Sequence, residues 1–160
     1  MQTTRIRHYL HTIITGLSAV LLTACFPDTH YVTYQHVDAY GWERDSVLEY
    51  TIPHVDDDGT YMSEIDLRTT RAYPFTRLYL IVSQTIYPAG RTITDTLNLE
   101  ISDNQGRQKG RGFTLLQQER PFRFLQLHQG DSLVIHVSHH MRRRLLLGIS
   151  DVGYRLVHND

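Results

Sequence analysis

Apolar and polar side chains alternate in short stretches from about residue 41 to the end of the chain. Neighbouring side chains of a β-strand point to opposite faces of a sheet, so this alternation predicts strands with one buried face. The stretch 77–87 (RLYLIVSQTIY) is the most apolar and is predicted to be a central strand. The other predicted strands cover residues 47–52, 61–68, 92–101, 122–127, 132–138 and 152–157.

Turn residues separate these stretches. Asp56-Asp57-Asp58-Gly59 is typical of a hairpin turn, because an Asp-Gly pair adopts positive φ at little cost. Residues 88–90 (PAG) and 103–106 (DNQG) predict further turns. Helical patterns are confined to the short segments 114–119 and 140–147. The pattern therefore predicts an all-β fold, an antiparallel β-sandwich (jelly-roll or immunoglobulin-like) of about seven or eight strands.

The first 24 residues have the form of a secretory signal. Residues 1–11 carry Arg5 and Arg7 but no acidic side chain, and the apolar run 12–24 is shorter than the roughly 20 residues that span a bilayer. The run ends in Leu-Thr-Ala-Cys, with small side chains directly before Cys25, which is the lipobox pattern of bacterial lipoproteins. We therefore predict cleavage before Cys25 and lipid attachment to its thiol, which would hold the protein at a lipid bilayer.

This prediction divides the chain into a signal peptide at 1–24, a lipidated tether at 25–40 that can end in a first short strand, and a β-sandwich domain at 41–160. Cys25 is the only cysteine, so no internal disulfide can form. The alternative interpretation makes Cys25 an ordinary small residue at the end of a signal or short anchor helix. The basic start, the short apolar run and the small residues before a single cysteine together favour the lipobox.

The charge of the mature part is nearly balanced. It carries 14 lysines and arginines against 17 aspartates and glutamates, a formal charge of −3, while the whole chain carries −1. There is no basic field of the kind that attracts nucleic acid, so no nucleic-acid partner is expected. No second apolar run is long enough to span a bilayer.

Two clusters suggest a cation, but each has a plainer interpretation. His136 and His140 would share one strand face, with His139 on the other, and nothing indicates a third ligand. We interpret these histidines as solvent-facing. The acids at 56–58 are consecutive, whereas a calcium loop needs alternating ligands and a distal glutamate. No metal or cofactor is predicted.

No catalytic set emerges from the spacing. Gly106, Gly110 and Gly112 are spaced loosely like a phosphate loop, but no helix follows, and we interpret them as glycines of tight turns or a bulge. The chain has no G-x-S-x-G nucleophile elbow, and its carboxylates are scattered. Catalytic residues are therefore predicted to be absent.

Two surface features remain. Trp42 and Tyr40 form a candidate interaction surface, since aromatic side chains stack on sugars and are enriched at protein interfaces. A single tryptophan more often packs the open end of a sandwich, and we favour that interpretation for Trp42. Arg142-Arg143-Arg144 is either a contact for anionic lipid headgroups or a solvated basic segment, and we favour the solvated segment.

Several stretches occur together in a recognisable order. They are Gly41-Trp42, Asp45-Ser46-Val47, residues 73–82 (YPFTRLYLIV), Asp95-Thr96-Leu97, Asp103 with Gly106, Gly110 and Gly112, Met141-Arg142, and residues 147–155 (LGISDVGYR). In this order they resemble the gliding-motility lipoprotein GldH family of the Bacteroidota, over residues 42–156 and in the lipobox. The most specific piece is the closing motif with Gly148, Asp151, Gly153 and Arg155, which we interpret as structural. We expect Asp151 to hydrogen-bond the backbone near Gly153.

The resemblance implies a non-enzymatic lipoprotein of the cell envelope that works with gliding machinery and its secretion system through contacts with other envelope proteins. One departure is Arg107-Gln108-Lys109, where the family pattern has an aromatic residue, often tryptophan. The segment after Cys25 lacks the dense acidic run that sends lipoproteins to the cell surface, which favours a position facing the periplasm. The alternative function is a glycan-binding lipoprotein, for which Trp42 and the tyrosines are the motive.

Overall fold

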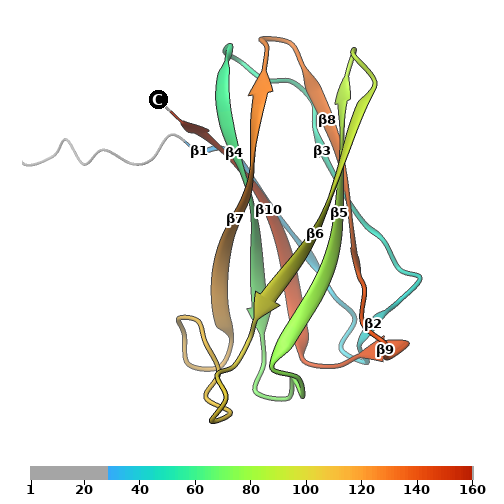
Figure 1. Cartoon of the computed structure of the whole chain (residues 1–160), viewed down its shortest axis with the longest axis vertical. Coiled ribbons are helices and arrows are strands. Elements are labelled where there is room, and N and C mark those ends of the chain that lie inside the picture. The colour runs from blue at the N-terminus through green and yellow to red at the C-terminus, as the bar shows by residue number, and fades with distance from the viewer. Residues whose placement is uncertain (1–28, 160) are drawn as a thin grey trace, which may run out of the picture.

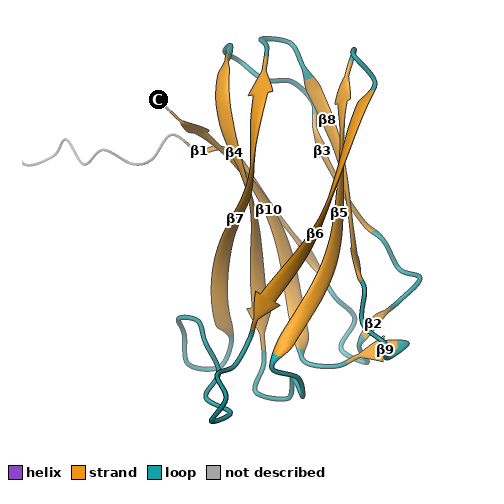
Figure 2. Cartoon of the chain, viewed as in Figure 1, coloured by secondary structure: helices purple, strands orange, loops and turns teal. Residues whose placement is uncertain are grey.

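Two four-stranded antiparallel sheets pack face to face in this protein (Figures 1 and 2). The computed structural model describes residues 29–159, and every regular element within them is a strand. In chain order the strands are β1 (Thr29–His36), β2 (Trp42–Glu43), β3 (Leu48–Ile52), β4 (Gly59–Thr69), β5 (Arg77–Tyr87), β6 (Arg91–Glu100), β7 (Leu116–Leu127), β8 (Ser132–His139), β9 (Leu145–Leu146) and β10 (Ile149–Asn159).

Each sheet draws on strands that are distant in the sequence. The first sheet has the order β1-β10-β4-β7, and the second has the order β3-β8-β5-β6. A two-stranded ribbon, β2-β9, lies at one end of the molecule (Figure 1). All pairings are antiparallel. The predicted all-β antiparallel sandwich is confirmed.

The segment Asp56–Gly59 does not close a hairpin, so that prediction is wrong. β3 pairs with β8 in the second sheet, whereas β4 lies between β10 and β7 in the first. Residues 53–58 therefore cross from one sheet to the other. Turn chemistry is local, but sheet membership depends on the partners that each strand finds elsewhere in the chain. By contrast, residues 88–90 do join the paired strands β5 and β6, with Gly90 at φ +66°.

The two predicted helical turns are also absent. β7 begins at Leu116 and pairs with β4 along its whole length, so the segment 114–119 is largely strand. The segment 140–147 contains the short strand β9, in which Leu146 is fully buried and pairs with Trp42. Burial against the rest of the molecule overrides a weak local helical pattern at both places.

The predicted tether extends into the folded domain. Residues 29–36 form β1, which pairs with β10 at the edge of the first sheet. The sequence allowed a short first strand here, and the structure contains one of eight residues. The rest of the predicted tether before Thr29, the signal peptide and Cys25 lie outside the described residues.

The core between the sheets is made by alternate residues of the long strands. On β5, Leu78, Leu80, Val82, Gln84 and Ile86 point inward and are at most 3% exposed. Gln84 is the polar member of this row, and its Oε1 accepts hydrogen bonds from Ser63 Oγ at 2.8 Å and from Tyr154 OH at 2.7 Å. Pairing of this kind offsets the cost of burying polar groups.

The loops gather at the two ends of the sandwich (Figure 1). β1 begins and β10 ends at the same end as the loops 53–58, 88–90 and 128–131, and we call this the entry end. The opposite end, which we call the far end, carries the loops 37–47, 70–76, 101–115 and 140–148 and the β2-β9 ribbon.

Candidate functional site

The far end exposes several apolar side chains. Tyr40 is 84% exposed, and Leu145 and Leu147 are 44% and 49% exposed. The two leucines lie against Gly41, the neighbour of Tyr40: a Cβ atom at Gly41 would meet Leu145 Cγ at 2.9 Å and Leu147 Cδ2 at 3.1 Å. Leu145 and Leu147 therefore flank Gly41, directly after Tyr40 in the chain, and we call these three exposed residues, Tyr40, Leu145 and Leu147, the far-end patch. Phe113, on another loop of the same end, is 88% exposed.

Trp42 is buried, which contradicts its place in the candidate interaction surface and agrees with the favoured interpretation that it packs the open end of the sandwich. Its side chain is only 2% exposed, and its Nε1 donates a hydrogen bond to the Ser46 carbonyl oxygen at 3.0 Å. The β2-β9 ribbon places it at the end of the core, where it fills the opening between the sheets. A buried indole cannot stack on a sugar, and the glycan-binding alternative loses its main motive.

His139 is also buried, which contradicts its predicted solvent exposure. Its ring packs edge-on against Trp42, with centroids 5.3 Å apart. Nε2 lies 3.1 Å from the Trp42 carbonyl oxygen, and Nδ1 accepts a hydrogen bond from the Met141 amide at 3.4 Å. Burial lowers the pKa of His139 below its ordinary value. A neutral ring with its proton on Nε2 satisfies both contacts.

The arginines of the loop 140–148 extend the far end beyond the patch. The Arg44 amide donates to the Arg144 carbonyl oxygen at 2.8 Å, and the Arg44 guanidinium contacts the Arg142 carbonyl oxygen, so the two loops are joined. Beside them, Phe75, Tyr79 and Met141 line a shallow apolar depression of about 590 Å³ whose rim includes Arg142 and Arg143.

The two ends of the molecule carry opposite charge. The far-end loops contain eight basic residues, Arg44, Arg71, Arg107, Lys109, Arg111, Arg142, Arg143 and Arg144, and four acidic residues, Asp38, Glu43, Asp45 and Asp103. The entry-end loops contain four acidic residues, Asp56, Asp57, Asp58 and Asp131, and no lysine or arginine. The nearly neutral chain is therefore strongly polarised along its long axis.

The candidate cation ligands do not converge. Within residues 29–159, no group of three or more histidine, cysteine, aspartate or glutamate side chains is placed to hold a metal ion. His136 Nε2 lies 3.0 Å from the Glu49 carboxylate, on the outer face of the second sheet. Asp58 Oδ1 instead accepts a hydrogen bond from the Gln129 amide at 2.7 Å, which joins two entry-end loops.

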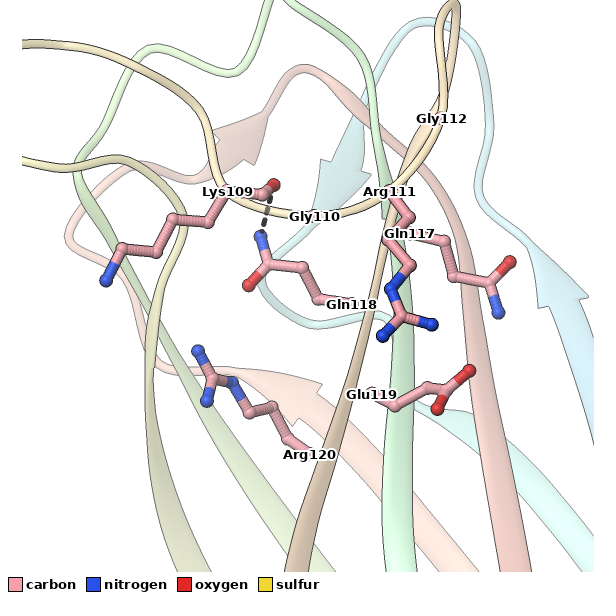
Figure 3. Close-up of a pocket in the computed structure, with 8 residues that line it drawn as sticks. All are labelled: Lys109, Gly110, Arg111, Gly112, Gln117, Gln118, Glu119 and Arg120. Carbon is pink, nitrogen blue, oxygen red and sulfur yellow. Dashed lines mark hydrogen bonds between the residues drawn. The ribbon is translucent and has the colours of Figure 1, made fainter.

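A concave site of about 650 Å³ lies beneath the glycine-containing loop at the far end (Figure 3). It is lined by residues 109–112 and by the first part of β7, residues 117–120. Arg111 extends along β7 beside Glu119, whereas Arg120 extends to the other side of the strand, beside Gln118 (Figure 3). This site was not predicted from the sequence, because it forms where a loop lies against the edge of a strand. In the sequence, only the spacing of the glycines pointed to the loop.

Comparison with known proteins decides the family. The family model described as "GldH lipoprotein" matches residues 29–156, which is the whole described sandwich apart from its last residues. The chain belongs to the GldH lipoprotein family. The resemblance read from the sequence is confirmed.

Two relatives in the Bacteroidota carry the same name. The chain is 29% identical over 151 residues to "Gliding motility lipoprotein GldH" of Flavobacterium johnsoniae, covering 90% of this chain and 94% of the relative. It is 23% identical to a GldH homolog of Christiangramia forsetii, covering 88% and 91% of the two chains. Among solved structures, a protein of Sulfurospirillum deleyianum aligns over 81% of this chain and 98% of its own, with 9% identity and a TM-score of 0.42.

Membership in this family of gliding-motility lipoproteins supports a membrane-anchored position in the cell envelope. Within residues 29–159 there is no helix of the length and apolarity needed to cross a membrane. The anchor expected from the sequence, Cys25, precedes the described residues and remains a prediction.

The closing motif begins at Gly148, directly before β10, and its residues Gly153 and Arg155 lie on the outer side of the first sheet. Gly153 pairs with Tyr34 of β1, and the tyrosine ring lies across it: a Cβ atom at Gly153 would be 2.7 Å from the ring. The ring crosses β10 so that its hydroxyl reaches β4, where it donates to Asp66 Oδ2 at 2.6 Å. The absence of a side chain at Gly153 makes this crossing possible.

Arg155 completes the same cluster. Its guanidinium donates to Asp66 Oδ2 at 2.9 Å and lies 3.6 Å from the Glu119 carboxylate. Asp66 is only 1% exposed, although its position faces outward, because Tyr34 and Arg155 cover it. A buried carboxylate is costly unless it is paired, so the contacts from Arg155 and Tyr34 stabilise Asp66 in the fold. Burial raises the pKa of neighbouring Glu64.

The other two motif residues act at the beginning of β10. Gly148 has φ +85°, and a Cβ atom there would be 2.3 Å from the Tyr73 amide nitrogen, so only glycine fits. Asp151 does not hydrogen-bond the backbone near Gly153, and that expectation is wrong. Its carboxylate instead accepts a hydrogen bond from Ser150 Oγ at 2.7 Å and lies 3.2 Å from His36 Nδ1 of β1.

Proposed function

We propose that this chain is a non-enzymatic, lipid-anchored component of the gliding-motility and associated secretion apparatus that binds another envelope protein with its far end. The observation that carries the proposal is the far-end patch of Tyr40, Leu145 and Leu147, which exposes large apolar side chains on a net basic surface. Exposed aromatic and apolar groups beside arginines are typical of protein interfaces.

The predicted anchor supports this assignment of ends. Only residues 26–28 separate Cys25 from Thr29, the first residue of β1. Even fully extended, this segment reaches only about 14 Å. β10, with 11 residues, runs about 36 Å from the far end to the entry end. A lipid at Cys25 would therefore hold the entry end beside the bilayer and leave the far end available to a partner in the periplasm.

The charge distribution agrees with this arrangement. The entry-end loops carry four aspartates, with Arg91 at the start of β6 as a single nearby arginine, and so favour anionic headgroups little, whereas the basic far end would attract an acidic protein surface. The alternative interpretation of Arg142–Arg144 as a lipid contact is not part of the proposal, which places these arginines beside the far-end patch.

Photocrosslinking in living cells tests the proposal. A photoreactive amino acid is placed at Tyr40 or at Leu147 in the full-length lipoprotein, and at Thr96, exposed on the outer face of β6, as a matched control. We expect a discrete crosslinked product from the two far-end positions, with a partner that mass spectrometry identifies as a component of the gliding or secretion machinery. Equal crosslinking from Thr96, or no product from either far-end position, would contradict the proposal.

A further inference from the structure

The apolar depression at the far end has walls from two loops and a strand. Phe75 comes from the loop 70–76, Tyr79 from the outer face of β5, and Met141 from the loop 140–148 (Figure 1). All three side chains are half-buried, so each still presents apolar surface to a ligand. The volume of about 590 Å³ falls within the range of ligand-binding clefts, roughly 300–1,000 Å³.

The walls of this depression are fixed to one another. The His140 amide donates a hydrogen bond to the Tyr79 carbonyl oxygen at 2.7 Å, which ties the loop to the strand. Gly148 packs directly on the backbone of Tyr73, where a Cβ atom would be 2.3 Å from the amide nitrogen. The Tyr73 ring in turn packs edge-on against Phe75, with centroids 5.8 Å apart. The depression is therefore preorganised, which lowers the entropic cost of binding.

The rim of the depression carries arginines without acidic partners. Arg142 and Arg143 are exposed, and no carboxylate of residues 29–159 forms an ion pair with either. No acidic side chain lines the depression. A second hollow of about 290 Å³ shares Arg142 with it and adds Arg44, so the basic surface continues to one side. These charges are left for carboxylates from outside the chain.

We propose that the depression binds an aromatic or large aliphatic side chain of an acidic segment of the partner protein, whose neighbouring carboxylates pair with Arg142 and Arg143. Apolar anchors in pockets supply much of the binding energy at protein interfaces, and complementary charges set register and speed of encounter. An anionic lipid has the same two chemical features, but a lipid at Cys25 would hold the opposite end of the domain beside the bilayer, which favours a protein. The inference rests on the proposed function and adds the chemistry of the partner's contact.

Fluorescence anisotropy with defined peptides tests the inference. The full-length lipoprotein in phosphatidylcholine nanodiscs is titrated against a labelled peptide with one central Phe between pairs of Glu. Two variant peptides carry Ser in place of Phe or Gln in place of Glu, and empty nanodiscs give the background. We expect the first peptide to bind about fivefold or more tightly than either variant peptide.

Variants of the protein locate the contact. Tyr79→Ser should weaken binding about tenfold, because it removes one apolar wall and leaves the backbone unchanged. Tyr87→Ser is its matched control, since Tyr87 is an exposed tyrosine on the same face of β5 at the entry end. Arg142→Gln and Arg143→Gln should each weaken binding about threefold to fivefold. Arg71→Gln removes a charge from the same end outside the depression, and its affinity should stay within about twofold.

Three results would overturn the inference. They are equal binding of the Phe and Ser peptides, an equal loss of affinity in Tyr79→Ser and Tyr87→Ser, and displacement of the labelled peptide by phosphatidylglycerol vesicles at a lower concentration than by the unlabelled peptide. The last result would mean that the depression recognises an anionic lipid. If no peptide binds while the photocrosslinks from Tyr40 and Leu147 persist, the inference about the depression fails and the proposed function stands.

Discussion

At the scale of single residues, Gly153 and Tyr34 explain the most specific part of the sequence motif. The tyrosine ring is fixed at its tip by Asp66 and Gln117 and on its face by the Arg68 guanidinium, whose Cζ lies 4.1 Å from the ring centroid. A ring fixed in this way cannot move aside for a side chain on β10. The glycine and the tyrosine are therefore expected to depend on each other energetically.

A double-mutant cycle measures this dependence. We expect Gly153→Ala to lower the free energy of unfolding by about 1–2 kcal/mol, because the new Cβ displaces the ring. In a Tyr34→Ala background the same substitution should cost about 1 kcal/mol less. Urea unfolding of the four proteins gives the coupling energy. Additive effects of the two substitutions would show that the Tyr34 ring is not the reason why position 153 requires glycine.

His139 should make the stability of the domain sensitive to pH. Burial holds its folded-state pKa below the ordinary value of 6.5, so the unfolded chain binds the proton more readily than the folded one. Stability present at neutral pH is then lost as the pH falls below about 6.5, by at most about 1.4 kcal/mol per pH unit for one group.

Thermal unfolding between about pH 7.5 and 5.5 checks this expectation. His139→Gln keeps a hydrogen-bond donor and an acceptor but does not titrate in this range. The melting temperature of this variant should therefore fall less on acidification than that of the unaltered protein. His54→Gln, which changes an exposed histidine, serves as the control. If the His139 variant loses as much stability between the two pH values as the control, the buried histidine is not the cause.

Residue-level prediction from the sequence succeeded where exposure follows from local chemistry and failed where distant strands cover a side chain. Tyr40 was predicted at the surface and is exposed. Burial of Trp42 was favoured, but the pairing that produces it, of β2 with β9 more than 100 residues further on, was not predicted. No feature of the sequence near Trp42 predicts that pairing. His139 was expected to face solvent and is buried against Trp42.

At the scale of elements, the long strands were predictable because alternation is a local property. β5 has the predicted bounds, β3 and β8 differ from prediction by one residue at one end, and β6 is shifted by one residue at both ends. The first part of β7 was missed because its residues 117–120 are all polar and lie under the glycine-containing loop. Strand order was not predictable, since it depends on pairings such as β1 with β10.

The role of β1 can be tested by truncation. β1 covers the edge of β10 and supplies Tyr34 to the buried Asp66. We expect a chain that begins at residue 37 to melt at a lower temperature than one that begins at residue 29, and to aggregate, because the freed edge of β10 is open to pairing with other chains. Circular dichroism and size-exclusion chromatography report both effects. Equal melting temperatures would mean that β1 is an accessory strand.

At the scale of the whole molecule, the proposed function requires an anchor at one end and a binding surface at the other. Cys25→Ala should abolish acylation and leave the precursor uncut, because the thiol that carries the lipid is gone. Metabolic labelling with a fatty-acid analogue and the migration of the protein in gel electrophoresis report the two events. A Cys25→Ala protein that is processed normally and remains in the membrane fraction would refute the lipid anchor.

Co-purification of the native lipoprotein tests the central claim most directly. The full-length protein and a Tyr40→Ser/Leu147→Ser variant are isolated from crosslinked envelopes, and the bound proteins are quantified by mass spectrometry, with Thr96→Ser as the control. The account predicts that a component of the gliding or secretion machinery is recovered with the unaltered protein and the control and is depleted about tenfold with the far-end variant, while melting temperature and membrane fraction stay the same. Equal recovery with all three proteins, or the absence of any such component, would contradict it.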